Sequence, residues 1–598
     1  MKIILERIKN KEDLIKKFKM NYSTLCETYE ELEKNPSRLK KTAILADFLT
    51  KLKKSNQPNI IYLLQGKVFP DYSEKEFGIS EQLCIKALEK ASGISSKEIV
   101  NKWRKIGDLG SVAEEVISKK KQNTLFSSKL TTDKVLDNLK KLPELSGMGT
   151  VDRKMSLISE LLTSATGLEA KYIIRTLLSD LRIGVASGTI RDAIVWSCFG
   201  NPKEDESNKQ ELKQAAEAVQ ESYDKANDFA LVFDKACLGI KHLHDTELVP
   251  GKPIKVMLAP KAESIADGFD RCKDENGNIA VEYKYDGFRM LINKDVEGNI
   301  KIFTRRLDNV TKQFPDVVKY IKENIDAKTF ILDSEAVGYD PKTKIYKPFQ
   351  DVSQRIKRKY DIERLEKELP VEVNVFDILY YNGKSYLDEP FEKRSILVRK
   401  IIHEKKYHLQ PAHQLITNSE DEAEKFFQQA LKDNQEGIMI KNLKSPYKPG
   451  ARVGHMLKFK PNDNEFDLVI TAAEYGTGKR AGTLSSFTLS CRDEKTDNLL
   501  EIGKASTGLK EKEELGLSYT ELTNLIKPLI LKTVGREVIV KPKIVVTVIY
   551  QNIQVSQSYE SGFALRFPRI TRLRPDRSIK DIVSLEEIKR DFKKFELH

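Results

Sequence analysis

Long apolar runs are missing from this sequence of 598 residues, which nowhere reaches the roughly 18 consecutive apolar residues of a membrane-spanning helix. The stretch after Met1 has only three apolar residues in a row, too few for the core of a signal peptide. These two absences predict a protein that does not associate with membranes and resides in the cytoplasm.

Cysteine is scarce as well, with six residues spread along the chain and no CxxC pair. A disulfide framework or a zinc site requires cysteines at close, recurring spacings, so neither is indicated and a reducing compartment is favoured. The six are Cys26, Cys84, Cys198, Cys237, Cys272 and Cys491.

Charge is abundant instead, because 32% of the residues are charged and the formal net charge is +13. A hydrophobic content of 40% supplies enough material for folded cores, and the length predicts three or four domains. The positive balance favours a polyanionic partner such as nucleic acid, although many basic proteins bind none.

Periodicity divides the chain into regions of different secondary structure. Apolar residues recur at helical spacing in the first region, for example in Asp133–Leu142 and Lys154–Leu162. The Pro- and Gly-containing stretch Leu248–Pro253 is typical of a linker. After Phe466, short apolar strands with Gly-rich turns indicate a small β-barrel. We therefore predict domains over residues 1–245, 246–461 and 462–598.

One stretch in the middle region, Val281–Met290, combines a lysine, an acid and an arginine in a predicted β-hairpin. Strand alternation puts Glu282 and Lys284 on one face, the Asp286–Gly287 pair indicates a turn, and Phe288 begins the returning strand. Lysine becomes a nucleophile when burial or a neighbouring cation frees its amine of the proton. Taken alone, the stretch also fits a surface hairpin with one charged face.

Strands further along the chain carry polar residues that a purely structural strand does not need. Phe330–Val337 holds two acids on one face, which are costly to bury unless they are paired or hold a metal. Lys458 and Lys460 share a strand face, and such a pair requires an anion. Strand parity puts Glu436 and Lys441 on opposite faces, so we predict that Lys441 lies outside the site.

The hairpin has the form K-x-D-G-x-R, and together with the later strands it resembles motifs I, III, IIIa, IV and V of the ATP-dependent DNA ligases, members of the covalent nucleotidyltransferase superfamily. The resemblance covers almost the entire chain and is closest to the archaeal and eukaryotic replicative type. It implies an all-α N-terminal DNA-binding domain, an α+β nucleotidyltransferase (adenylation) domain and a C-terminal β-barrel OB-fold domain.

The resemblance also implies a role for each motif residue. Lys284 would attack the α-phosphorus of ATP and carry AMP covalently, Glu282 would accept a hydrogen bond from the adenine amino group, and Phe376 would stack on the base. Glu335 and Glu436 would hold Mg²⁺ or another divalent cation, or would position the ribose. Arg289, Arg305 and Arg452 would contact the sugar and phosphates of the nucleotide or the DNA 5′-phosphate. Lys458 and Lys460 would neutralise the charge that grows on the α-phosphate in the transition state.

An arginine-rich segment near the C-terminus, Leu565–Arg577, resembles motif VI of the same ligases. In that family the segment swings over the nucleotide, so Arg574 and Arg577 would orient the pyrophosphate leaving group. The family pattern of this motif ends R-x-D-K, whereas the motif in this chain ends with Arg577. Arginine in place of lysine keeps the charge and changes the donor geometry.

Two features of the first region resemble the DNA-binding domain of these ligases. Arg175 and Arg182 lie two helical turns apart on a helix predicted to end at Gly184, where they would contact DNA phosphates. A predicted loop is similar to the sliding-clamp-binding motif of archaeal ligases, through Gln122, Leu125 and Phe126. The alternative for this loop is a phenylalanine that packs back on its own domain.

We therefore predict an ATP-dependent DNA ligase that seals 5′-phosphate/3′-hydroxyl nicks through lysyl-AMP and adenylated DNA, in replication, repair and recombination. Its partners would be nicked duplex DNA and a sliding clamp, and it would act as a monomer. One rival is an RNA ligase or capping enzyme, which the long helical N-terminal region disfavours. The other is a catalytically silent DNA clamp or scaffold, which the complete set of Lys284, Glu335, Glu436 and Lys458 disfavours.

Overall fold

The computed structural model describes residues 20–596 except 56, 74, 121–128, 202–208, 348–351, 353, 357–359, 462–463, 478–479, 481 and 512–515. Contacts divide the chain into two compact units, one of Met1–Ala423 with Met439–Lys458 and one of Glu424–Ile438 with Phe459–His598. The three domain boundaries expected from the sequence therefore stay predictions. Among the described residues, no helix has both the length and the apolar character needed to cross a membrane.

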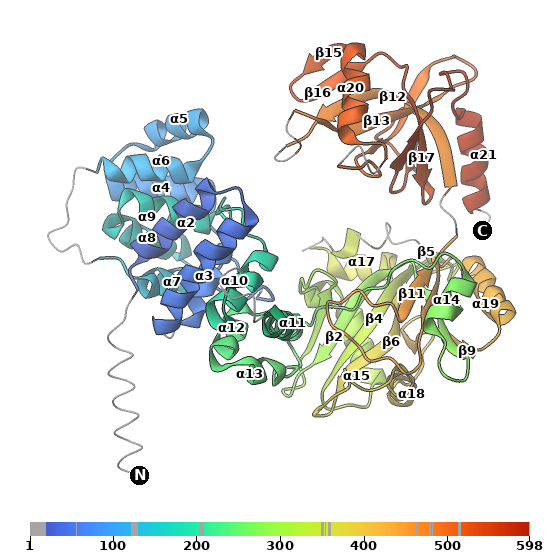
Figure 1. Cartoon of the computed structure of the whole chain (residues 1–598), viewed down its shortest axis with the longest axis horizontal. Helices are drawn as coiled ribbons and strands as arrows, with labels where there is room; N and C mark the ends of the chain where they lie inside the picture. Colours follow the sequence, from blue (N-terminus) through green and yellow to red (C-terminus); the bar gives the residue numbers. More distant parts are fainter. Residues whose placement is uncertain are drawn as a thin grey trace. The chain divides into compact units, whose positions relative to one another are not determined.

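The first region is helical, as the apolar spacing predicts, and Figure 1 shows it in blue to green. The predicted helices at Asp133–Leu142 and Lys154–Leu162 are confirmed within a few residues. The elements are α2 (Tyr22–Lys34), α3 (Arg38–Ser55), η1 (Pro58–Gln65), α4 (Glu81–Ser92), α5 (Ser96–Ile106), α6 (Leu109–Ser118), α7 (Thr132–Lys141), η2 (Leu142–Glu144), α8 (Thr150–Ser164), α9 (Gly167–Leu177), α10 (Ser187–Phe199), α11 (Lys209–Ala226), α12 (Phe229–Leu238) and α13 (Ile240–His244).

Local chemistry explains where several of these helices begin. The Thr166 hydroxyl accepts a hydrogen bond from the Glu169 amide, while the Glu169 carboxylate accepts one from the Thr166 amide, which forms a capping box at α9. Asp108 caps α6 by accepting from the amides of Gly110 and Ser111. Each cap satisfies backbone donors that a helix start leaves without a partner.

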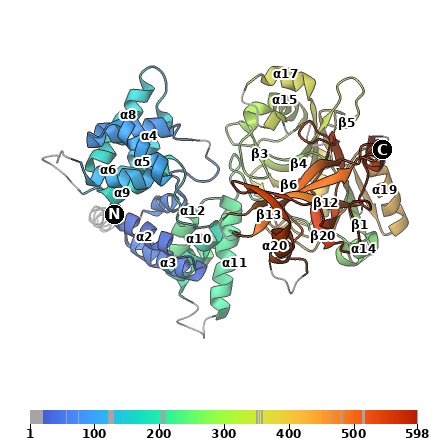
Figure 2. The same cartoon turned by 90° about the horizontal axis from the view of Figure 1, so that it is seen from above.

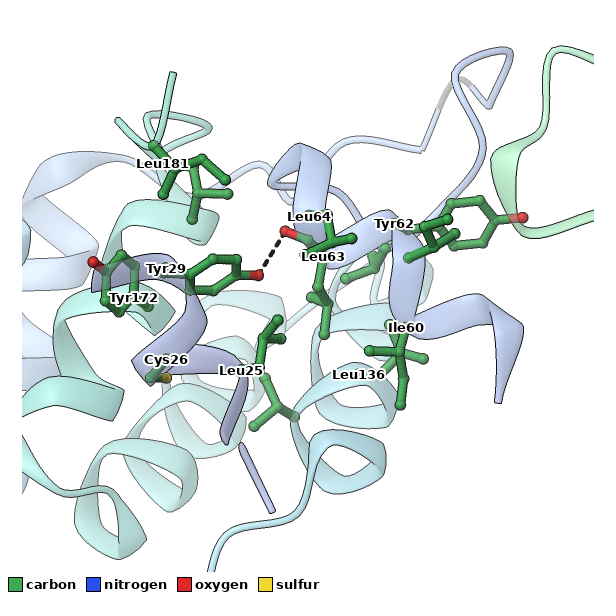
Figure 3. Packing of buried hydrophobic residues seen from close by; sticks show 14 of the residues in the cluster. Leu25, Cys26, Tyr29, Ile60, Tyr62, Leu63, Leu64, Leu136, Tyr172 and Leu181 are labelled. Atoms are coloured by element: carbon green, nitrogen blue, oxygen red, sulfur yellow. Dashed lines mark hydrogen bonds between the residues drawn. The ribbon is translucent and has the colours of Figure 1, made fainter. Parts of the chain in front are cut away.

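The core of the helical region packs aromatic side chains against the short helix η1 (Figure 3). Tyr29 of α2 is buried, and its hydroxyl donates to the Leu63 carbonyl of η1 at 2.7 Å. The rings of Tyr29 and Tyr172 of α9 lie 4.7 Å apart, centroid to centroid. Residues from three helices therefore fix one another, and the buried hydroxyl of Tyr29 has a partner.

The middle region contains two sheets with helices, in the strand orders β11-β10-β1-β9 and β3-β2-β4-β6-β7; β5 pairs with β4, and β8 pairs with β6. The elements are α14 (Ile265–Cys272), β1 (Ile279–Lys284), β2 (Phe288–Lys294), β3 (Ile300–Thr304), η4 (Thr311–Gln313), α15 (Pro315–Asn324), β4 (Phe330–Tyr339), β5 (Tyr346–Lys347), α17 (Ile362–Glu368), β6 (Val371–Tyr381), β7 (Lys384–Ser385), α18 (Phe391–Ile401), β8 (Leu409–Pro411), β9 (Gln414–Thr417), α19 (Glu420–Lys432), β10 (Gly437–Lys441) and β11 (Met456–Phe459).

The predicted β-hairpin at Val281–Met290 is wrong in one respect. Both strands exist, yet β1 pairs with β9 and β10 in one sheet, whereas β2 pairs with β3 and β4 in the other. The Asp286–Gly287 turn therefore links two sheets. A turn motif reports a change of chain direction, and the pairing partner is decided by tertiary contacts that the local pattern does not contain.

The C-terminal region is β-rich and closes into a barrel; Figure 2 shows several of its strands, in orange to red, beside α20. Its elements are β12 (Asn464–Tyr475), β13 (Leu484–Arg492), β14 (Leu499–Ala505), α20 (Tyr519–Ile526), η7 (Lys527–Leu529), β15 (Ile530–Val534), β16 (Glu537–Val540), β17 (Val545–Tyr550), β18 (Ile553–Val555), β19 (Phe563–Leu565), β20 (Arg569–Leu573) and α21 (Leu585–Glu596).

Strand pairing confirms the OB-fold expected for this region. Antiparallel pairs join β14 to β13, β13 to β12, β12 to β17 and β17 to β20. The ring closes through a parallel bridge between Thr507, just after β14, and Arg569 of β20, where the Ile570 amide donates to the Thr507 carbonyl at 3.0 Å. Five strands thus form the closed order that defines this small barrel.

Candidate active site

Lys284, half-buried, is the last residue of β1, and the turn after it is pressed against β4. A Cβ atom on Gly287 would lie 2.2 Å from the Ala336 carbonyl oxygen and 3.1 Å from Cγ of Glu335. Only glycine fits so close an approach of two backbones. The glycine of K-x-D-G therefore holds the chain beside Lys284 against the strand that carries Glu335.

Glu282 precedes Lys284 by two residues on β1 and is almost completely buried. Its Oε2 lies 2.5 Å from Nζ of Lys441, and its Oε1 accepts a hydrogen bond of 2.8 Å from Nε2 of Gln414. Burial raises the pKa of Glu282, and the charge of Lys441 opposes that rise. Both carboxylate oxygens are therefore oriented by fixed partners.

The prediction that Lys441 lies outside the site is wrong, because its side chain is buried and paired with Glu282. Parity counting failed because β10 begins only at Gly437, whose φ of +142° interrupts the alternation after Glu436. A buried lysine requires an acidic partner. Because Lys441 ends the apolar run Gly437–Lys441, this requirement indicates that Lys441 has a buried acidic partner.

Arg289 of β2 is held from several directions by buried groups. Its Nε donates to Oδ1 of Asp333 at 2.7 Å, its Nη2 also pairs with Asp333, and its Nη1 donates to the Met257 carbonyl at 3.0 Å. The Tyr447 hydroxyl donates to Asp333 at 2.7 Å and accepts from the Met257 amide at 2.9 Å. Burial lowers the pKa of Arg289, but Asp333 more than offsets this and the pKa is raised. Arg289 is thus a fixed cation, and sequence reasoning did not assign Asp333 and Tyr447 to it.

Phe376 of β6 lies between the two buried ion pairs. Its ring centroid is 5.3 Å from Cζ of Arg289 and 5.0 Å from Nζ of Lys441, both within the range of cation–π contacts. The next residue, Asp377, is buried and accepts a hydrogen bond of 2.7 Å from Nε of Arg394. The predicted base-stacking residue therefore has a half-exposed ring in a position that charged neighbours fix.

The predicted metal-binding acids lie in different settings. Glu335, half-exposed on β4, is the cross-strand partner of Arg289 on β2. Glu436 is half-buried and forms an ion pair with Lys460. Lys458 is on β11, half-buried, and its amide donates to the Pro260 carbonyl at 2.9 Å.

The two remaining predicted nucleotide contacts in the middle region, Arg305 and Arg452, are exposed. Arg305 lies in the turn after β3, and Arg452 is anchored by a parallel bridge to Leu258.

The arginines of the motif VI segment are paired with acids of their own barrel. Oδ2 of Asp467 on β12 lies 2.8 Å from Nη1 of Arg574 and 3.0 Å from Nη1 of Arg577. Asp576 adds hydrogen bonds of 3.0 Å and 2.8 Å to Arg574, and the Thr547 hydroxyl donates to Asp467 at 2.6 Å. Asp467 is therefore the common anchor of both arginines.

The expectation for Arg175 and Arg182 needs correction. Helix α9 ends at Leu177, so only Arg175 is helical, and it is buried between Asp108 and Glu33 at 2.8 Å from each. Arg182 is 43% exposed, adopts a φ of +59° outside the helix and pairs with Asp180 at 2.6 Å. The apolar spacing continued past Leu177, although a folded turn replaces the helix there. Of the two arginines, only Arg182 is exposed.

The clamp-motif residues Gln122, Leu125 and Phe126 lie outside the described residues. No structural outcome is attached to that prediction.

Comparisons with known proteins assign the three regions to one family. Residues 21–195 match the family described as DNA ligase N terminus, residues 256–460 match ATP dependent DNA ligase domain, and residues 480–577 match ATP dependent DNA ligase C terminal region. A solved structure named "Pmar-Lig_PreS3" covers 92% of this chain and 99% of its own, with a TM-score of 0.52 at 16% identity, which supports the fold alone.

Curated relatives are similar along nearly the full length. The DNA ligase of Nanoarchaeum equitans is 42% identical over 574 residues, covering 95% of this chain and 98% of the relative. The DNA ligase of Thermococcus fumicolans is 38% identical over 572 residues, covering 95% and 98%. The chain thus belongs to the ATP-dependent DNA ligase family.

Proposed function

We propose that this ATP-dependent DNA ligase seals nicks in duplex DNA by carrying AMP on Lys284. The observation that carries the proposal is the placement of Lys284 at the end of β1, two residues after a buried, doubly held Glu282 and beside the strand of Glu335. A scaffold protein gains nothing from burying such charges, because each costs desolvation free energy.

The reaction then has three balanced steps. The deprotonated amine of Lys284 attacks the α-phosphorus of ATP, the bond to the bridging oxygen breaks, and pyrophosphate leaves. The 5′-phosphate of the nick attacks the AMP phosphorus, and the P–N bond breaks and returns the amine. The 3′-hydroxyl then attacks the DNA phosphorus, which forms the phosphodiester and expels AMP.

The base and the phosphates are assigned to separate groups. Glu282 accepts from the adenine amino group, oriented by Lys441 and Gln414, and Phe376 stacks on the base. Charge growing on the α-phosphate is balanced by the cations Arg289, Arg305, Arg452, Lys458 and Lys460, with Arg574 and Arg577 orienting the pyrophosphate. Because Asp333 and Met257 already engage Arg289, the exposed Arg305 and Arg452 have more donors to offer.

Magnesium fits the acids of this chain. The described residues contain no cluster of three or more His, Cys, Asp or Glu side chains placed to hold a metal, and Mg²⁺ normally uses only one or two carboxylates with waters and substrate phosphates. We assign its carboxylate ligands to Glu335 and Glu436, each considered by itself, and the ion would neutralise phosphate charge.

The DNA partner is assigned by charge. The net charge of +13 and the exposed Arg182 support contacts to the phosphate backbone that are salt-sensitive and nearly independent of sequence. We further propose that the protein acts as a monomer in the cytoplasm. It would bind a sliding clamp through Gln122, Leu125 and Phe126.

The decisive experiment combines α-labelled ATP with a nicked duplex. Lys284→Ala should take up no acid-labile label, whereas Lys273→Ala, at an exposed lysine paired with Asp270 at 3.2 Å, should label like wild type. A nick that already carries AMP on its 5′-phosphate bypasses the lysine, so Lys284→Ala should still seal it. Label on the alanine variant, or sealing by it with free ATP, would refute the assignment.

The two rivals are tested by the same preparation. An RNA ligase would seal nicked RNA faster than nicked DNA, and a DNA scaffold would bind the nick without any label. We expect DNA sealing with ATP, and none with NAD.

A further inference from the structure

Two cysteines of the helical region face each other across neighbouring helices. Cys198 is in the last turn of α10 and Cys237 in the last turn of α12, and their Sγ atoms are 3.7 Å apart. Figures 1 and 2 both show α10 and α12 side by side. The residues are 39 positions apart, so the contact is made by the fold and not by local sequence.

The exposure of this pair sets it apart from the other cysteines. Both Cys198 and Cys237 are partly exposed, at the border of the helical core. The other four free cysteines, Cys26, Cys84, Cys272 and Cys491, are buried. A dissolved reagent can therefore reach the pair directly and reaches the others only if the protein opens.

Electrostatics distinguish the two sulfurs from each other. The pKa of Cys198 falls to about 7, because its hydrogen bonds with the Cys237 thiol and then with the Ser197 hydroxyl, together with the charge of Lys53, outweigh the effect of burial. The same hydrogen bond, followed by burial and by the charge of Asp234, raises the pKa of Cys237. The hydrogen bond between the two sulfurs thus stabilises a thiolate within the pair, with the second thiol placed next to it.

By contrast, burial raises the pKa of the other cysteines. It does so to about 12 for Cys84, Cys272 and Cys491, and well above the ordinary value for Cys26. Since the thiolate is the reactive form, these four thiols are poor nucleophiles at neutral pH.

We propose that Cys198 and Cys237 form a reversible dithiol–disulfide site, oxidised by low-molecular-weight disulfides. The Cys198 thiolate attacks one sulfur of the small disulfide, whose S–S bond breaks and releases one thiolate that takes up a proton. Cys237 then loses its proton and attacks Sγ of Cys198, which expels the second small thiol. Two protein thiols lose two electrons, and one small disulfide gains them.

Closing this bond requires a small movement. The sulfurs must approach from 3.7 Å to about 2.05 Å, the length of a disulfide. Both residues are at helix ends, where the backbone can adjust more easily than in the middle of a helix. The bond would enclose α11 in a covalent loop and leave the nucleotide-binding residues untouched.

The test uses the full-length protein with glutathione disulfide as the probe, followed by peptide mass mapping. Wild type should lose two hydrogens through a Cys198–Cys237 bond, without retained glutathione, and dithiothreitol should reverse it. Cys237→Ser and Cys198→Ser should each trap one glutathione on the cysteine that remains, because neither variant has the second thiol that would displace it. The four buried thiols are internal controls and should stay unmodified.

A second measurement reports the covalent loop. Oxidised wild type should unfold its helical region roughly 5 °C higher than reduced wild type, while the two serine variants show no redox shift. Labelling of each protein with α-labelled ATP checks that it is folded and should be equal in both redox states. Glutathione retained on wild-type Cys198, modification of the buried thiols at the same rate, or the absence of a redox shift would overturn the proposal.

Discussion

The ion pairs of the candidate site are buried in the middle region, whereas those of the motif VI arginines in the OB-fold barrel are open to solvent. The carboxylate of Asp333 is fully buried with Arg289, and Glu282 with Lys441 is nearly so. In the barrel, Arg574 and Arg577 remain 22% and 40% exposed while they pair with Asp467. Water can replace a partner in the second case but not in the first, because an unpaired charge is expensive only where water is excluded.

The helical region repeats this contrast within eight residues. Arg175 is 4% exposed between two acids, whereas Arg182 is 43% exposed beside Asp180. A buried ion pair holds its side chains in one position, whereas an exposed arginine can leave its acidic partner and bind a phosphate. Five substitutions test this division, from the largest expected effect to the smallest.

Asp333→Ala should destabilise the protein most, by about 3–5 kcal/mol, because it leaves Arg289, whose side chain is only 17% exposed, without its counter-charge. Urea unfolding followed by circular dichroism measures this. The matched control is Asp326→Ala, at an exposed acid that pairs with His403, where we expect a change within about 0.5 kcal/mol. Equal effects of the two variants would remove the distinction between the two kinds of pair.

Arg175→Met should cost the helical region about 3 kcal/mol, since Asp108 and Glu33 lose their cation. Arg38→Met, at an exposed arginine on Asp192, is the control and should be nearly neutral. Thermal unfolding of both variants gives the comparison. A neutral Arg175→Met would show that the buried pair is dispensable.

Acid unfolding gives an independent measure of the same network. The pKa of Asp108 is lowered to about 2, because Arg175, Ser111 and Gly110 donate to it and outweigh the opposing effect of burial. A depressed carboxyl pKa stabilises the fold above the unfolded value of about 3.9 and loses that contribution as the pH falls toward 2. Wild type should therefore lose stability over this interval, and Arg175→Met should lose less.

Lys441→Met should raise the KM for ATP in lysine adenylation by about 10- to 100-fold, since a charge-assisted hydrogen bond to Glu282 is lost. Burial already raises the pKa of Glu282, and loss of the lysine raises it further, so the defect should grow as the pH falls from 8 to 6. Lys444→Met, at an exposed lysine on Glu392, should leave KM unchanged. A pH-independent defect would contradict a role through Glu282.

Arg182→Ala should weaken binding to nicked DNA about 5-fold at moderate salt. The slope of the logarithm of the binding constant against the logarithm of the salt concentration should fall by about the value of one phosphate contact. Thermal stability should not change, because the residue is exposed. Arg364→Ala, at an exposed arginine on Glu368, is the charge-matched control. Fluorescence anisotropy at several salt concentrations separates a phosphate contact from a general loss of positive charge.

Asp467→Asn should have the smallest effect, a fall in the KM for ATP of about 2- to 3-fold. The amide keeps an acceptor for Thr547 but holds Arg574 and Arg577 less firmly, so both are freer to meet pyrophosphate oxygens. Asp497→Asn, at a barrel acid whose side chain is 76% exposed and lies 3.5 Å from Arg492, is the control. An increase in KM would mean that Asp467 orients the arginines for catalysis and does not compete for them.

Periodicity predicted element types well because it reports burial. The strand at Phe330 and the helices at Asp133 and Lys154 have one buried face or two, and alternation or helical spacing follows directly from that. Strand-pairing partners were harder to predict from the sequence, since β1 and β2 look like a hairpin locally and belong to different sheets.

The motifs named candidate site residues, whose roles stay predictions, but they did not indicate the partners that come from far away in sequence. Lys441 and Gln414 meet Glu282 across 159 and 132 positions, and no local pattern contains such a meeting. Arg175 illustrates the opposite error. An arginine suggested a contact with a DNA phosphate, although Asp108 and Glu33, which are distant in the sequence, already pair with it. Counting buried charges that need partners would have improved both assignments.

The seam of the barrel gives the motif VI segment a spectroscopic reporter. Thr507 joins β20 just ahead of Arg574, and a Cβ atom on the neighbouring Gly508 would lie 2.1 Å from the Ile570 carbonyl oxygen. The Ile570 amide, bonded to the Thr507 carbonyl, therefore exchanges its hydrogen with solvent only when this seam parts. Its protection factor, compared with that of amides within β12, measures how often the strand before the arginines detaches.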